Sequence, residues 1–120
     1  MTTAVPVNPQ QVPTAVAMAP AVVRAIAEAV QPKAIVLFGS VARGTAQTNS
    51  DLDLAIIDDF AAAGRDREQT YRMVNRAIWD FAVGIDIVVF SPEEWQSGRQ
   101  SWIHVASICA AEGKVVYGAL

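Results

Sequence analysis

Apolar residues follow two spacings along the chain, and together these predict alternating helices and strands. Continuous or alternating apolar runs predict strands at residues 34–38, 51–57, 85–90 and 114–117. Helical spacing and chain breakers predict helices at residues 21–30, 41–44, 61–82 and 100–112. Ser91, Pro92 and Glu94 add a helix start, with serine as the cap and glutamate at the third position. This order predicts an α/β (α+β) fold, in which helices flank a small mixed β-sheet.

Length and composition limit the classes of protein to consider. The 120 residues suit one domain, and a chain that is 52% hydrophobic and 18% charged is neither disordered nor fibrous. No stretch of about 18 residues is uniformly apolar, so no membrane span is expected. A net charge of −3 and a pI near 4.9 leave no broad basic surface for duplex nucleic acid. The chain has one cysteine, Cys109, so it cannot form an internal disulfide. The classes that remain are a cytoplasmic enzyme and a cytoplasmic binding domain.

The first twenty residues differ from the rest because they carry no charge and hold four prolines. We interpret residues 1–20 as a flexible or partner-docking arm, with residues 1–13 extended. The domain itself is expected at residues 21–120.

Three aspartates are candidate metal ligands. Asp51 and Asp53 stand two residues apart on a predicted strand, so both carboxylates point to one face. Asp86 stands on the next strand between Ile85 and Ile87, where an aspartate without a partner has no packing role. Adjacent carboxylates repel one another, and a bound divalent cation removes that cost. Oxygen ligands favour Mg²⁺, with Mn²⁺ as the alternative.

A turn follows the first predicted strand and has the features of a phosphate-binding segment. At Gly39 no side chain blocks an approaching phosphate, and the Ser40 hydroxyl adds a donor. This is not the P-loop of ATPases, because Thr45 stands where that loop requires lysine. Arg43 is a candidate for orienting phosphate; the alternatives are a solvated arginine or one paired with an aspartate.

These segments carry a resemblance that covers about residues 21–118. With Gly39-Ser40-Val41-Ala42-Arg43-Gly44, then Ser50-Asp51-Leu52-Asp53-Leu54, then Asp86, the chain resembles the DNA polymerase β-like nucleotidyltransferase superfamily. It is most similar to the minimal nucleotidyltransferases that act as antitoxins beside HEPN-domain toxins. Val41 departs from the pattern, since such antitoxins often have a basic residue there.

The resemblance implies a polymerase β-like fold and a set of site residues. Gly39 and Ser40 would bind the triphosphate, Asp51 and Asp53 would bind the metals, and Asp86 would be the third, catalytic carboxylate. Two Mg²⁺ ions would be the cofactors and ATP the substrate.

The implied reaction is AMP transfer from ATP to a hydroxyl, in this family a tyrosine of the HEPN toxin. The chain would thereby act as an antitoxin and would form an oligomer with its toxin. One alternative is an antitoxin that neutralises the toxin by binding alone. Another is nucleotidyl transfer to a small molecule or an RNA end.

Other prominent residues have simpler interpretations. We expect His104 in a packing or surface role and Cys109 as a small core residue. The tryptophans are expected as core or interface anchors; they are Trp79, Trp95 and Trp102. The arginines of the long predicted helix are expected on a solvated face, or against an acidic partner; they are Arg65, Arg67, Arg72 and Arg76.

Overall fold

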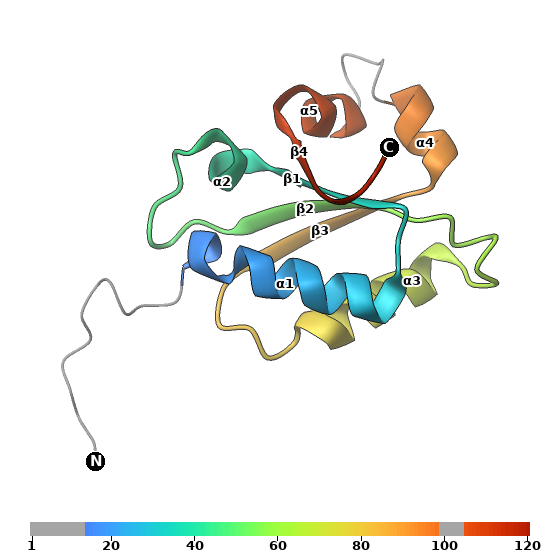
Figure 1. The fold of residues 1–120 in the computed structure, drawn as a ribbon, viewed down its shortest axis with the longest axis horizontal. Helices are drawn as coiled ribbons and strands as arrows, with labels where there is room; N and C mark the ends of the chain where they lie inside the picture. Colours follow the sequence, from blue (N-terminus) through green and yellow to red (C-terminus); the bar gives the residue numbers. More distant parts are fainter. Residues whose placement is uncertain (1–13, 99–104) are drawn as a thin grey trace.

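Four strands form one mixed sheet in the order β3-β2-β1-β4, in a computed structural model that describes residues 14–98 and 105–120 (Figure 1). The strands are β1 (Ala34–Phe38), β2 (Leu52–Ile57), β3 (Ile85–Phe90) and β4 (Lys114–Gly118). β1 pairs antiparallel with both β2 and β4, whereas β2 and β3 are parallel. All four predicted strands are confirmed, and only two of their ends shift, each by one residue. The mixed sheet flanked by helices is confirmed as well.

Helices cover both faces of this sheet. Figure 1 shows α1 (Ala15–Val30) and α3 (Arg67–Ile78) on one side, and α4 (Pro92–Gly98) and α5 (Val105–Glu112) on the other. Successive strand residues point to opposite faces, so Leu54 packs with the α1 and α3 core while Ala55 packs with the α4 and α5 core. Burial on both faces explains why β1 and most of β2, the two central strands, are apolar runs in the sequence.

The first helix begins at Ala15, so the prediction of a start at Ala21 was wrong. Thr14 caps the helix, because its Oγ1 accepts a hydrogen bond of 3.1 Å from the Ala17 N–H. Pro20 lies inside the helix and lacks the N–H that would reach the Val16 carbonyl. Both residues are exposed, so water can solvate that carbonyl. Residues 15–20 therefore belong to the helix and not to the predicted arm, whose residues 1–13 lie outside the described part.

The long helix predicted at residues 61–82 is shorter at both ends, since α3 spans Arg67–Ile78. Gly64 has a left-handed backbone with φ of 78°, which ends the preceding turn. Asp66 then starts the helix through a capping box with Gln69, each side chain accepting a backbone N–H of the other. The predicted apolar stripe is confirmed, with Val74 buried and Tyr71 packed beside it.

The helices on the other face agree with their predicted caps. Ser91 and Glu94 form the expected capping box at the start of α4. Trp95 and Cys109 are buried against the sheet, which confirms both as core residues. The predicted helix at residues 100–112 is observed as α5 from Val105; residues 100–104, with Trp102 and His104, lie outside the described residues. Trp79 is 83% exposed and does not belong to the core.

Arg65 departs from the expected solvated arginine face and meets an acidic partner within the protein itself. It precedes α3, its side chain is 16% exposed, and its guanidinium binds the buried Asp58 carboxylate at 2.9 Å. The same group donates to the Val30 carbonyl at 3.0 Å, which joins the end of α1 to the end of β2. The other three arginines lie on α3; Arg67 pairs with Glu94, Arg72 pairs with Glu68, and Arg76 is exposed.

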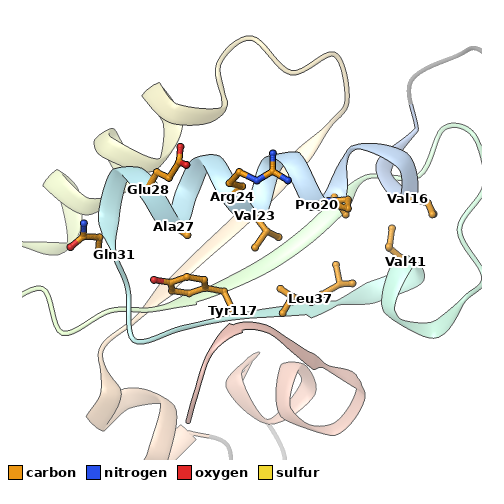
Figure 2. Close-up of a pocket in the computed structure, with 12 residues that line it drawn as sticks. Val16, Pro20, Val23, Arg24, Ala27, Glu28, Gln31, Leu37, Val41 and Tyr117 are labelled. Carbon is orange, nitrogen blue, oxygen red and sulfur yellow. The ribbon is translucent and has the colours of Figure 1, made fainter.

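An apolar groove of about 920 Å³ runs between α1 and β4. Figure 2 shows Val23 of α1 facing Leu37 and Tyr117 across it, with Arg24 and Glu28 farther out on the helix. β4 carries a bulge here: Ile35 pairs with Tyr117 and Val36 with Val115, so Val116 is an extra residue. None of the described helices is long and apolar enough to cross a membrane.

Candidate active site

The predicted aspartates gather where β2 and β3 begin. Asp53 and Asp86 are register partners on these parallel strands, so their carboxylates stand side by side on the face that carries α4 and α5. Asp51 lies one residue before β2. Asp53 is partly buried, whereas Asp51 and Asp86 are exposed, so this group opens to solvent. Asp86 was expected between apolar neighbours in a covered strand, and its exposure reflects the edge position of β3.

Two glycines make room for these carboxylates. A Cβ atom at Gly39 would overlap Oδ2 of Asp53, and one at Gly84 would overlap Oδ1 of Asp51. Gly39 also has φ of 75°, a conformation that other residues rarely adopt. It follows Phe38, the register partner of Asp53, so the end of β1 carries the Gly39-Ser40 pair directly to the acidic group. The structure thus brings the two predicted motifs together.

The electrostatics of the acidic group centre on Asp53. Its pKa is raised above the ordinary value of 3.8, first by burial and then by charge repulsion and hydrogen bonding with Asp86. Asp51 and Glu112 add smaller repulsion in the same direction. Four acidic residues therefore act on one another at this end of the sheet.

The helix predicted at residues 41–44 is α2 (Gly39–Arg43), which begins at the glycine itself. Gly44 ends it with φ of 76°, and the Thr45 N–H donates to the Ser40 carbonyl at 3.0 Å. Arg43 is paired, but with a glutamate and not with the expected aspartate. Its Nη1 binds Oε2 of Glu112 at 2.9 Å, although half of the arginine side chain remains exposed.

Comparison with protein families identifies the domain. The model of the nucleotidyltransferase domain family matches residues 21–106, well over half of the chain. The chain belongs to this family. β1, β2, β3 and the three aspartates lie within the matched residues, and β4 follows them, which ties the geometry of the acidic group to a nucleotidyltransferase. A comparison with curated protein sequences finds no match.

Solved structures share the fold of this nucleotidyltransferase domain. A protein from Sulfolobus solfataricus assigned as a nucleotidyltransferase is 19% identical, with a TM-score of 0.58 over 86% of this chain and 79% of that one. A toxin–antitoxin structure with AMP-PNP is 22% identical, with a TM-score of 0.55 over 82% and 71%. A mutant of the toxin–antitoxin pair MntA–HpeT is 20% identical, with a TM-score of 0.55 over 84% and 72%. At these identities the likeness shows the fold, and the expected polymerase β-like architecture is confirmed.

The donor set of this nucleotidyltransferase fits a divalent cation. Carboxylate oxygens are the ligands that Mg²⁺ and Mn²⁺ prefer, and the raised pKa of Asp53 reports repulsion that a cation would relieve. Among residues 14–98 and 105–120, no three acidic, histidine or cysteine side chains already stand in a metal-holding arrangement. The side chains of the three aspartates would therefore have to move to share an ion.

Glu112 is the residue at this site that sequence reasoning missed. Its Oε1 accepts a hydrogen bond of 3.1 Å from the Gly39 N–H, while its Oε2 pairs with Arg43. The hydrogen bond from Arg43 lowers the pKa of Glu112, so the carboxylate is charged at neutral pH. No local pattern marks this residue, because its partners lie about seventy residues earlier in the chain.

Proposed function

We propose that this nucleotidyltransferase transfers AMP from ATP to a tyrosine hydroxyl of a partner HEPN toxin and so acts as its antitoxin. The observation that carries the proposal is the juxtaposition of the Asp53–Asp86 pair with Gly39-Ser40 at one end of the sheet. Family membership supports the reaction class. The toxin partner is supported by the fold shared with two toxin–antitoxin structures, one of which contains AMP-PNP.

The acidic group supplies the ligands that the reaction needs. Asp51, Asp53 and Asp86 would hold divalent cations, two Mg²⁺ ions by family resemblance. When bound, these ions supply charge neutralisation for the triphosphate and the attacking oxygen. The three aspartates open to solvent, and this suits an acceptor hydroxyl that belongs to another protein.

Gly39, Ser40 and Arg43 would position the phosphates. The absence of a side chain at Gly39 lets a phosphate reach its backbone N–H, and the Ser40 hydroxyl is a further donor. Arg43 offers a planar guanidinium, the group best suited to phosphate oxygens. These residues would hold the triphosphate with its α-phosphorus towards the aspartates.

Transfer itself exchanges one phosphorus–oxygen bond for another. The tyrosine oxygen forms a bond to the α-phosphorus, and the bond from that phosphorus to the oxygen bridging the β-phosphate breaks. Pyrophosphate leaves with the electron pair of the broken bond. Asp86 would accept the proton of the tyrosine hydroxyl, acting as a general base.

Mass spectrometry of the toxin tests this proposal. A HEPN toxin incubated with this protein, ATP and Mg²⁺ should gain the mass of one or more AMP units, and omission of any one component should prevent the gain. Asp86→Asn should abolish the gain but leave the complex intact. Asp59→Asn is the matched control, since it neutralises an exposed carboxylate at the opposite end of β2 and should transfer normally.

The same experiment separates transfer from neutralisation by binding alone. If Asp86→Asn still neutralises the toxin in cells and no added mass appears with the unaltered protein, the protein is a binding antitoxin. Mass gained by an RNA or a small molecule instead of the toxin would place the acceptor elsewhere.

A further inference from the structure

The last residue of α5 occupies the donors that the proposed function assigns to phosphate. Glu112 accepts the Gly39 N–H through Oε1 at 3.1 Å and the Arg43 guanidinium through Oε2 at 2.9 Å. A carboxylate and a phosphate are both anionic acceptors that guanidinium and backbone N–H groups bind in the same way. The Gly39 N–H has a single hydrogen, so it cannot serve Glu112 and a phosphate oxygen fully at once.

We propose that Glu112 controls access to the nucleotide site: its carboxylate holds Gly39 and Arg43 in the nucleotide-free protein, and the triphosphate binds by displacing it. This inference rests on the proposed function, because it takes Gly39 and Arg43 as phosphate donors. It adds that Glu112 competes with the triphosphate for these two donors, and this competition gives the contacts of Glu112 a function.

The surroundings of Glu112 allow its side chain to leave while its backbone stays. A Cβ at the neighbouring Gly113 would overlap the Cys109 carbonyl of α5 and the Val36 side chain of β1, so the backbone at the end of α5 is packed directly against the sheet. The Glu112 side chain is 26% exposed and has three rotatable bonds, so it can turn into solvent. Displacement therefore requires a change of side-chain rotamer and no movement of the helix.

The negative charge of Glu112 also favours displacement of its side chain when a triphosphate binds. Glu112 is close enough to the aspartates to contribute to the raised pKa of Asp53. Its negative charge therefore also lies within reach of a polyphosphate bound at this end of the sheet, where like charges repel. Removing the charge while keeping the shape of the side chain should strengthen nucleotide binding.

Calorimetric titration with Mg²⁺ and α,β-methylene-ATP, which blocks transfer, provides the test. Glu112→Gln retains the size of the side chain but makes a neutral and weaker acceptor, so we expect the Kd to fall about fivefold. Glu112→Ala removes the acceptor and should also bind more tightly than the unaltered protein. Glu93→Gln is the matched control: it neutralises an exposed glutamate beyond the opposite end of β3 and should leave the Kd unchanged.

The direction of the change separates control of access from a structural role. A glutamate that only held Arg43 in place would make both variants bind more weakly, and a Kd that is unchanged or higher in both overturns the inference. If the unaltered protein, Glu112→Gln and Glu112→Ala all fail to bind the analogue, the proposed nucleotide site itself is wrong. If the unaltered protein binds and the Glu112 variants bind no better, only the inference fails.

Discussion

Replacement of Gly84 by alanine tests the acidic site without altering any carboxylate. Gly84 stands one residue before β3, and Oδ1 of Asp51 lies in the space that an alanine Cβ would fill. Gly84 is not among the glycines with positive φ, so alanine introduces no left-handed strain. The substitution therefore acts on Asp51 by moving its carboxylate.

The expected effect on stability is small. Alanine lowers the entropy of the unfolded chain and thereby stabilises the fold by about 0.4–1 kcal/mol. Turning the Asp51 side chain away from its rotamer costs about 0.5–1.5 kcal/mol. The two contributions offset each other, so the free energy of unfolding of Gly84→Ala should change by less than about 1 kcal/mol.

The expected effect on activity is large. A metal ligand is productive only in the right position, and disturbing the groups that orient such ligands weakens metal binding or activity by about 10- to 100-fold. We expect Gly84→Ala to lower the rate of AMP transfer to the toxin by about that factor and to require more Mg²⁺. The assay is transfer of labelled AMP measured across a Mg²⁺ titration, together with thermal unfolding.

Gly64→Ala is the matched control, with the opposite pattern. A Cβ at Gly64 meets open space, but its φ of 78° makes alanine cost about 1–2 kcal/mol of stability. Gly64→Ala should unfold at a lower temperature and should transfer AMP at the normal rate. Because Asp51→Asn removes the displaced group, adding Gly84→Ala to it should cause no further loss. Gly84→Ala working at the normal rate and Mg²⁺ dependence would refute the role assigned to Asp51.

Three further predictions concern stability and reactivity. Folding raises the pKa of Asp53 above 3.8, so its ionised form destabilises the metal-free protein. Asp53→Asn should therefore raise the melting temperature at pH 7. This gain should shrink as the pH falls towards 3.8 and vanish below that pH, where Asp53 is protonated in both states. Arg65→Ala leaves Asp58 buried without its cation and should cost about 3–5 kcal/mol in urea unfolding, whereas Arg72→Ala on the surface should cost below about 1 kcal/mol; equal losses would contradict the buried pair. Burial raises the pKa of Cys109 to about 11, so iodoacetamide at pH 8 should modify this thiol only after unfolding, and rapid modification of the native protein would show that the thiol is accessible.

Local patterns in the sequence determined most of the fold. The apolar run at 34–38 is a strand because the centre of a sheet covered on both faces needs apolar side chains at successive positions. Ser91 and Glu94 start α4 because a capping box involves residues only three apart. The start of α3 was predicted too early, at residue 61, because apolar residues at helical spacing continue before residue 67. The capping box of Asp66 and Gln69, which marks the true start, is also a local signal in the sequence.

The candidate site was only partly predictable for a related reason. Strand periodicity placed Asp51 and Asp53 on one face, and Asp86 was recognised on the next predicted strand, because both inferences depend on regular strand geometry. Which side chain lies against Gly84 and Gly39 depends on how the ends of three strands meet, which no local spacing specifies.

Contacts between distant segments were decided by the tertiary structure alone. Glu112 reaches Gly39 and Arg43 because β4 returns beside β1 and places the end of α5 over α2. Arg65 leaves solvent because the turn before α3 brings it to the buried Asp58. Caps and periodicities depend on residues within a few positions of one another, so the sequence displays them directly. Ion pairs between segments depend on the path of the whole chain, and only the folded structure shows which charges meet.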